Sequence, residues 1–181
     1  MQRPSYAWGP LSRYGVIVAL IAAAADLASK YYLLMVYDLP SRGQVAVAPF
    51  VDFVFVRNFG ISYGLFQQNS AAGQWTLLAI KAAAGILIWA WLARAESRLT
   101  ALALGLILGG ALGNAIDRLD HGWVTDFVLF YIDFGAWRFN WYVFNLAGVA
   151  IVAGVAGLLY ESLFRAPRSG AAPQNRPDRP Q

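Results

Sequence analysis

Four long apolar segments dominate the pattern of hydrophobic and polar positions along the chain. They run over residues 14–35, 75–92, 99–116 and 141–164. Each is close to the roughly 20 residues that a helix needs to cross about 30 Å of hydrocarbon. A closed barrel also satisfies its backbone in lipid, but these segments lack the two-residue alternation of barrel strands. The pattern therefore predicts an all-α membrane protein, a bundle of four transmembrane helices.

The composition supports a membrane protein and narrows the chemistry. Of the 181 residues, 59% are hydrophobic and 13% are charged, against roughly 25% charged in soluble domains. A single domain of this length cannot bury so much apolar surface in a soluble core. The chain has no cysteine and a single histidine, His121, which argues against Cys- or His-based metal sites. We expect no metal, no cofactor and no nucleic-acid partner.

Basic residues are distributed unevenly over the segments that connect the predicted helices. Eight lie in the N-terminal tail, the short second connection and the C-terminal tail: Arg3, Arg13, Arg94, Arg98, Arg165, Arg168, Arg176 and Arg179. The two longer connections carry four: Arg42, Arg57, Arg118 and Arg138. The positive-inside rule predicts cytoplasmic termini and external long connections. Residues 165–181, rich in Pro, Gly and Arg, are expected to be a disordered cytoplasmic tail.

The first long connection, residues 37–74, is expected to form a small external lobe that contains β-structure. Its residues 45–56 favour strand, and Pro49 marks a turn or an edge. The following R-N-F-G sequence contains Asn58 and Gly60, which suit a tight backbone turn.

The first apolar segment carries two ionisable residues, Asp26 and Lys30. Four positions apart on a helix, they share one face and can form an ion pair that faces the bundle interior. A second interpretation, compatible with the first, has Lys30 extend to the outer membrane surface with Asp26 as its local partner. A cleaved signal peptide is a weaker interpretation of this segment, since its apolar character resumes after Lys30 and it reaches spanning length.

The third apolar segment ends in a cluster of polar residues. Its glycines at 105, 109 and 113 lie on one helix face and allow a neighbouring helix to approach closely. Asn114, Asp117 and Arg118 follow within about one turn, and Asp126 comes shortly after. So many ionisable groups at the end of a membrane helix indicate the floor of a site, although an ordinary Asp–Arg pair at a helix end is the alternative. In the fourth predicted helix, Asn145 can hydrogen-bond across the bundle.

Five motifs in this order resemble those of the lipoprotein signal peptidases, also called signal peptidase II. They are D-L-A-S-K at 26–30, R-N-F-G at 57–60, G-G-A-L-G-N-A-I-D-R at 109–118, V-T-D-F at 124–127 and F-N-L-A at 144–147. The resemblance implies a monomeric aspartyl endopeptidase of the bacterial inner membrane. Such enzymes cut the signal peptide from prolipoproteins before a diacylglyceryl-modified cysteine. The resemblance further implies that residues of these motifs support the site and bind substrate: Asp26, Lys30, Asn58, Gly60, Asn114, Asp117, Arg118 and Asn145.

The resemblance also implies a pair of catalytic aspartates, of which this chain has one. The aspartate of V-x-D-F is Asp126, but the position that ends F-N-x-A-D is Gly148. Peptide hydrolysis by this chemistry needs one carboxylate as base and one carboxylic acid as donor, and two close carboxyls supply both. Asp133 is a candidate substitute if its loop folds over the site. Asp117 is expected to be held ionised by Arg118.

Three functions remain open on this basis. One is an active lipoprotein signal peptidase that uses Asp126 with a substitute partner. Another is an impaired relative that binds prolipoprotein signal segments without cutting them. A third, a small transporter with Asp26, Lys30 and Asp117 as a proton relay, has only its intramembrane charges in its favour.

Overall fold

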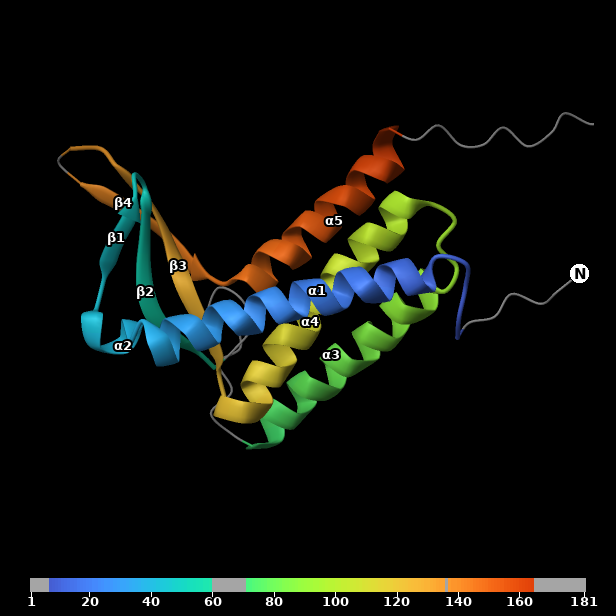
Figure 1. Ribbon diagram of the computed structural model, residues 1–181, viewed down its shortest axis with the longest axis horizontal. Helices are drawn as coiled ribbons and strands as arrows, with labels where there is room; N and C mark the ends of the chain where they lie inside the picture. The colour runs from blue at the N-terminus through green and yellow to red at the C-terminus, as the bar shows by residue number, and fades with distance from the viewer. Residues whose placement is uncertain (1–6, 60–70, 136, 165–181) are drawn as a thin grey trace, which may run out of the picture.

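The computed structural model of the chain describes residues 7–59, 71–135 and 137–164, with side chains left out of the description at 71–78 and 81. Its long helices are α1 (Ser12–Tyr31), α3 (Ala71–Leu92), α4 (Arg98–His121) and α5 (Leu146–Phe164). A π-helical turn η1 (Tyr32–Val36) extends α1, and a short helix α2 (Leu39–Arg42) follows. Figure 1 shows the helices packed together, with a sheet at one end of them.

Three helical stretches in the described residues are long and apolar enough to cross a membrane: Ser12–Val36, Arg98–His121 and Leu146–Phe164. Residues 82–92 of α3 form a shorter apolar stretch. Many large hydrophobic side chains on these helices are exposed, as expected when lipid and not water surrounds them.

Helix α4 packs against α1, α3 and α5. Its glycines permit the closest approaches, as the sequence predicted. A Cβ atom added at Gly105 would lie 2.6 Å from the carbonyl oxygen of Gly15. One added at Gly113 would lie 2.7 Å from Oδ2 of Asp26. Gly113 therefore leaves the space in which a carboxylate of α1 sits.

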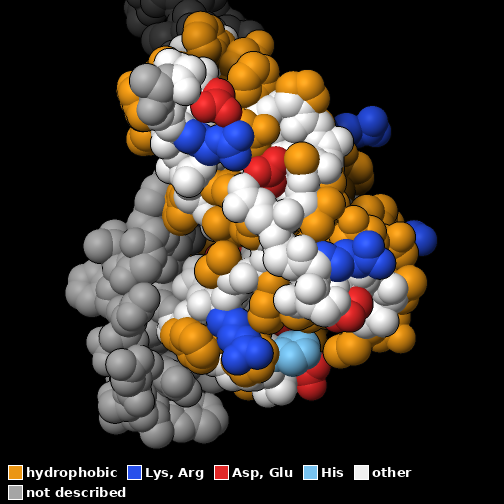
Figure 2. Space-filling view, turned by 90° about the vertical axis from the view of Figure 1, so that its left-hand side faces the viewer, with side chains coloured by type: hydrophobic (Ala, Val, Ile, Leu, Met, Phe, Trp, Pro, Cys, Tyr) orange, Lys and Arg blue, Asp and Glu red, His pale blue; other side chains and the backbone are white. Residues whose placement is uncertain are grey.

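The sheet is antiparallel, and its four strands follow the order β1-β2-β3-β4. The strands are β1 (Val45–Ala48), β2 (Val51–Asn58), β3 (Val124–Asp133) and β4 (Arg138–Phe144). The predicted β-structure in residues 45–56 is confirmed, with Pro49 in the turn between β1 and β2. Pairing of β2 with β3 sets Val56 opposite Asp126. Seen from the sheet end, acidic and basic side chains are scattered among hydrophobic ones (Figure 2).

The apolar membrane helices and a small sheet are present as predicted, but the protein is not all-α outside the first connection, because half of the sheet comes from residues 124–144. The fourth helix begins at Leu146 and not near residue 141, since Arg138–Phe144 pair with β3 as a strand. A continuous apolar run gives no periodicity that separates a strand from the start of a helix. The aromatic and β-branched residues of the segment favour the strand. The sheet thus joins residues 45–58 to the segment between α4 and α5.

Candidate active site

Asn145 connects the sheet to the start of α5. Its Oδ1 accepts the Gly148 backbone N–H at 2.8 Å, the geometry of an N-cap residue. Its Nδ2 donates to Asp126 Oδ1 at 2.6 Å, to Asn114 Oδ1 at 3.1 Å and to the Thr125 carbonyl at 3.2 Å. The side chain is buried, so one amide stabilises the helix start and orients Asp126.

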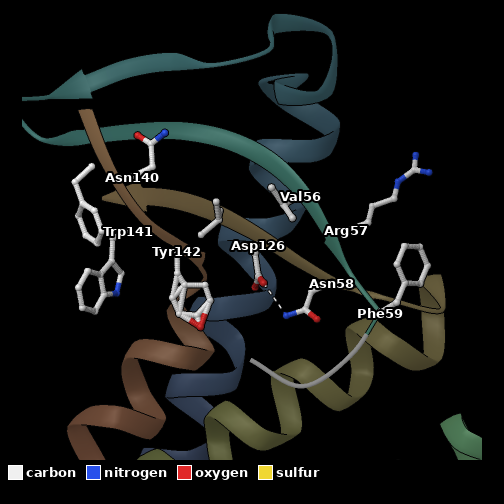
Figure 3. A pocket seen from close by; sticks show the side chains of 10 residues that line it. Val56, Arg57, Asn58, Phe59, Asp126, Asn140, Trp141 and Tyr142 are labelled. Carbon is white, nitrogen blue, oxygen red and sulfur yellow. Dashed lines mark hydrogen bonds between the residues drawn. The ribbon is translucent and has the colours of Figure 1, made fainter. Parts of the chain in front are cut away.

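Asp126 lies near the beginning of β3, with both carboxylate oxygens held by amides. Asn145 donates to Oδ1, and Asn58 Nδ2, at the end of β2, donates to Oδ2 at 3.0 Å. Figure 3 shows Asn58 and Asp126 facing each other. Burial raises the pKa of Asp126 from an ordinary 3.8 to about 6, while the Asn58 hydrogen bond and the Lys30 charge act in the opposite direction. A carboxyl with this pKa can exchange a proton near neutral pH.

Lys30 occupies the centre of a buried ionic cluster. Its Nζ lies 2.7 Å from Asp26 Oδ2 and 3.1 Å from Asp117 Oδ2, and it donates to Asn114 Oδ1 at 3.1 Å. Asp26 Oδ1 accepts the Ala147 backbone N–H at 2.8 Å. The predicted inward-facing pair is confirmed, and extension of Lys30 to the surface is excluded because its side chain is only 3% exposed. The cluster ties α1 to α4 and to the first turn of α5.

The charges of Asp117 and Arg118 interact, although the two side chains point in different directions. Consecutive residues of a helix point about 100° apart. Asp117 contacts Lys30, accepts the Thr125 backbone N–H at 2.6 Å and lies 2.9 Å from Nδ1 of His121. Arg118 Nη2 donates to the carbonyl of Asn58 at 3.3 Å. Asp117 thus anchors the start of β3, and Arg118 holds the end of β2.

Two cavities meet at Asp126. The outer cavity has a volume of about 530 Å³ and lies between β2, Asp126 and the β4 residues 139–143. The inner cavity, of about 480 Å³, continues along α5 and includes Asn114, Arg118 and Gly148. Asn58, Asp126 and residues 141–143 line both. Figure 3 shows Trp141 and Tyr142 across the outer cavity from Asn58.

Position 148, where the resemblance implies a second aspartate, lines the inner cavity together with Asp126 and has room for a side chain. A Cβ atom added at Gly148 would have Asn145 Oδ1, at 3.5 Å, as its one neighbour within 4 Å among the described residues. Asp133 does not fill this role. It ends β3, seven residues from Asp126 and so roughly 20 Å away along the strand, and it pairs with Arg138 at 2.9 Å. The hypothesis of Asp133 as a substitute does not fit this geometry.

All the expected support residues except one lie in a connected network around Asp126. Gly60 falls outside the described residues. Sequence reasoning missed the backbone N–H groups of Thr125 and Ala147 and the contact of His121 with Asp117. Of these, the sequence offered a signal only for the contact of His121 with Asp117, because residues four positions apart share one helix face. Among the described residues, no group of three or more His, Asp or Glu side chains is placed to hold a metal ion.

Comparison with known proteins agrees with this architecture. A sequence model of signal peptidase II matches residues 18–164. The chain is 54% identical over 159 residues to the lipoprotein signal peptidase of Nitrobacter hamburgensis, covering 88% of this chain and 97% of that protein. It is 50% identical over 167 residues to the lipoprotein signal peptidase of Methylobacterium sp. (strain 4-46), covering 90% and 98%.

Two solved structures of bacterial membrane enzymes, determined by the in meso method at 2.3 and 1.9 Å resolution, share the fold. Their TM-scores are 0.69 and 0.68, at 21% and 22% identity. The matches cover 87% and 90% of this chain and 94% and 99% of those chains. Together with the sequence matches over nearly the whole length, this establishes that the chain belongs to the signal peptidase II family, whose members are aspartic proteases.

Proposed function

We propose that this protein removes signal peptides from diacylglyceryl-modified prolipoproteins, with Asp126 as its catalytic residue. The observation that carries the proposal is the environment of Asp126, a buried carboxyl at the junction of two cavities. With a pKa of about 6, most of it is ionised at pH 7, and the carboxylate can take a proton from an attacking water. Asn58 and Asn145 fix its orientation.

The reaction also needs an acid for the leaving amine, and the described residues place no second carboxyl in contact with Asp126. A single carboxyl serves first as base and then as acid, but it cannot fill both roles at one moment. Acid or base assistance contributes typically about 10²–10⁴-fold to a rate. The proposed peptidase is therefore slow, and Gly148 is the reason.

The inner cavity suits a substrate that is both polar and lipid-modified. Asn114, Arg118 and Asp126 supply its polar end. Apolar side chains of α5 line the rest, among them Val149, Ile151, Val152 and Ala153. An acyl chain along α5 would leave the peptide bond next to its cysteine near Asp126.

The residues around Asp126 are proposed as positioning residues that hold the carboxyl, the sheet and the helix ends in place. They are Asp26, Lys30, Asn58, Asn114, Asp117, Arg118 and Asn145. None except Asp126 is assigned a proton-transfer step. Gly60, which belongs to the same R-N-F-G motif as Asn58, is proposed as a further residue of the site.

We further propose a monomer in the bacterial inner membrane with cytoplasmic termini. It has four membrane spans, which are α1, α4, α5 and, in addition, α3. In Figure 1 the first turn of α1, the α3–α4 connection and the end of α5 lie away from the sheet. Arg13, Arg94 and Arg98 belong to that side, in agreement with the positive-inside rule. The sheet then lies outside, in contact with outer-leaflet lipids. A reporter fused after Gln181 should be cytoplasmic, and an external reporter would contradict this topology.

The activity is tested by cleavage of a synthetic diacylglyceryl-modified prolipoprotein peptide in micelles. We expect slow cleavage that Asp126→Asn abolishes and that the matched change Asp133→Asn leaves unaltered. Binding of the same peptide is measured in parallel. Specific binding without any cleavage would show instead a protein that holds signal segments and does not cut them.

A further inference from the structure

Strand β4 lies at one edge of the sheet. It is last in the strand order, and among the described residues no strand pairs with its outer side. Its seven residues, R-F-N-W-Y-V-F, include aromatic side chains such as Phe139 and Trp141, 41% and 53% exposed. Natural proteins protect long, flat, hydrophobic edges, because such edges pair with any extended chain. The sequence of β4 carries no proline and only one charge to prevent that pairing. Its register with β3 shifts between Asn140 and Val143, so the regular part of the edge is Arg138 to Asn140.

The direction of the edge hydrogen-bonding groups follows from the register. Tyr131 of β3 donates its backbone N–H to the Phe50 carbonyl at 3.0 Å, away from β4. Tyr131 is the register partner of Asn140, so this pair exchanges no hydrogen bonds. Along an antiparallel pair of strands, hydrogen-bonded and non-hydrogen-bonded residue pairs alternate. The backbone N–H and C=O of Asn140 therefore point to the free edge, and those of Arg138 do the same.

The free edge is continuous with the site. Five consecutive β4 residues, 139–143, line the outer cavity together with Asn58 and Asp126. Beyond Phe144, the chain passes through Asn145, which contacts Asp126, into α5. An extended peptide with a bond held at Asp126 would thus pass along β4 as it leaves the site.

We propose that β4 is a docking strand for the substrate, and that the extended segment following the lipid-modified cysteine pairs with its outer edge. This inference rests on the proposed function, because the segment that would pair with β4 is the part of the substrate that follows the cleaved bond. In the proposed orientation, that segment runs outward from the membrane, whereas β4 runs inward toward α5. The two are antiparallel, and an antiparallel strand pairs somewhat more strongly than a parallel one. Main-chain bonds give affinity without demanding a particular sequence.

Backbone methylation of the substrate tests this pairing with the protein unchanged. A series of diacylglyceryl-modified peptides carries one N-methyl amide at each of the first six positions after the cysteine. Every second N–H of a paired strand points to its partner. We expect the dissociation constant to rise about five- to tenfold at alternate positions and to change less than about twofold at the others.

A pair of protein variants gives a matched second test. Asn140→Pro removes the edge N–H at a position where an edge strand tolerates proline, while Asn140→Ala keeps the N–H and removes the side chain. We expect about fivefold weaker binding for the proline variant alone, with thermal unfolding measured to confirm that both fold. Should the proline variant not fold, the methylation series decides.

The outcomes separate the inference from the function on which it rests. If the unmodified peptide binds tightly but N-methylation weakens binding equally at all positions, or at none, β4 is not a docking strand. The proposed peptidase function would still stand. A protein dimer that Asn140→Pro dissociates, without effect on the peptide, would assign the edge to a second copy. No binding of the unmodified peptide would overturn the proposed function and this inference together.

Discussion

Gly148→Asp should raise the rate of prolipoprotein cleavage by at least about 10²-fold. The backbone N–H of Gly148 and Oδ1 of Asp126 are bridged by the Asn145 amide through bonds of 2.8 and 2.6 Å. Both positions also line the inner cavity, and we expect one carboxymethyl group at 148 to reach Asp126. A new Cβ would meet Asn145 Oδ1 at 3.5 Å, an ordinary van der Waals contact. The new carboxyl would point into the inner cavity and share a proton with Asp126.

The expected magnitude follows from the chemistry that the second carboxyl adds. Acid–base assistance contributes at least about 10²-fold, equivalent to about 2.7 kcal/mol of activation free energy. The cost in stability should be small. Position 148 is the third residue of α5, where a carboxylate gains about 0.3–1 kcal/mol from the helix N-terminus. Desolvation opposes this gain, and the proton shared with Asp126 reduces that cost.

Initial rates on the diacylglyceryl-modified peptide measure the effect, with Gly148→Asn as a neutral control of the same size. The asparagine variant should cleave no faster than the parent. Asp126→Asn in the Gly148→Asp background should return the rate to the baseline. A rise of less than about threefold for Gly148→Asp, or an equal rise for Gly148→Asn, would refute the assignment of position 148 as a lost acid–base position.

Three further predictions concern stability, measured by thermal unfolding in detergent. Because the pKa of Asp126 is about 6 when folded against an ordinary 3.8, its contribution is complete below about pH 4. This contribution to the free energy of unfolding, at most about 3 kcal/mol, is lost as the pH rises through 6. In Asp126→Asn, stability should therefore depend less on pH over this range. Asp26→Ala should cost about 3 kcal/mol, because Lys30 stays buried with one carboxylate fewer; an unchanged melting temperature would refute the role of the pair. Gly113→Ala should destabilise by about 1–3 kcal/mol, since its Cβ would lie 2.7 Å from Asp26 Oδ2. Gly85→Ala, whose Cβ would meet no atom of another described element within 4 Å, is the control and should be neutral or stabilising.

The sequence was sufficient for features that local spacing determines. Apolar segments of spanning length predicted the helices, and the four-residue spacing of the glycines predicted the close approach of α4 to α1. Asp26 and Lys30 were predicted to pair for the same reason. Both the glycine face and the Asp26–Lys30 pair follow from helix periodicity alone. The structure keeps both features.

Features that depend on pairing between distant segments were not predictable in the same way. The strand β4 has an apolar pattern that merges with the helix after it, so the boundary at Asn145 was missed. An asparagine before an apolar helical run is a helix start signal, and it would have placed the boundary correctly. The ion pair of Asp117 with Lys30 depends on how α1 lies against α4, which spacing does not reveal.

Asn145 also determines where a proton can reside on the catalytic carboxyl. Its Oδ1 accepts a backbone N–H, so its Nδ2 must face Asp126. The amide of Asn58 occupies the other carboxylate oxygen. One lone pair on each oxygen is thus committed to a protein donor, and a proton drawn from water has to bind on the remaining side. Asp126 lines both cavities, so the proton can enter and leave by the route that the water and the peptide take.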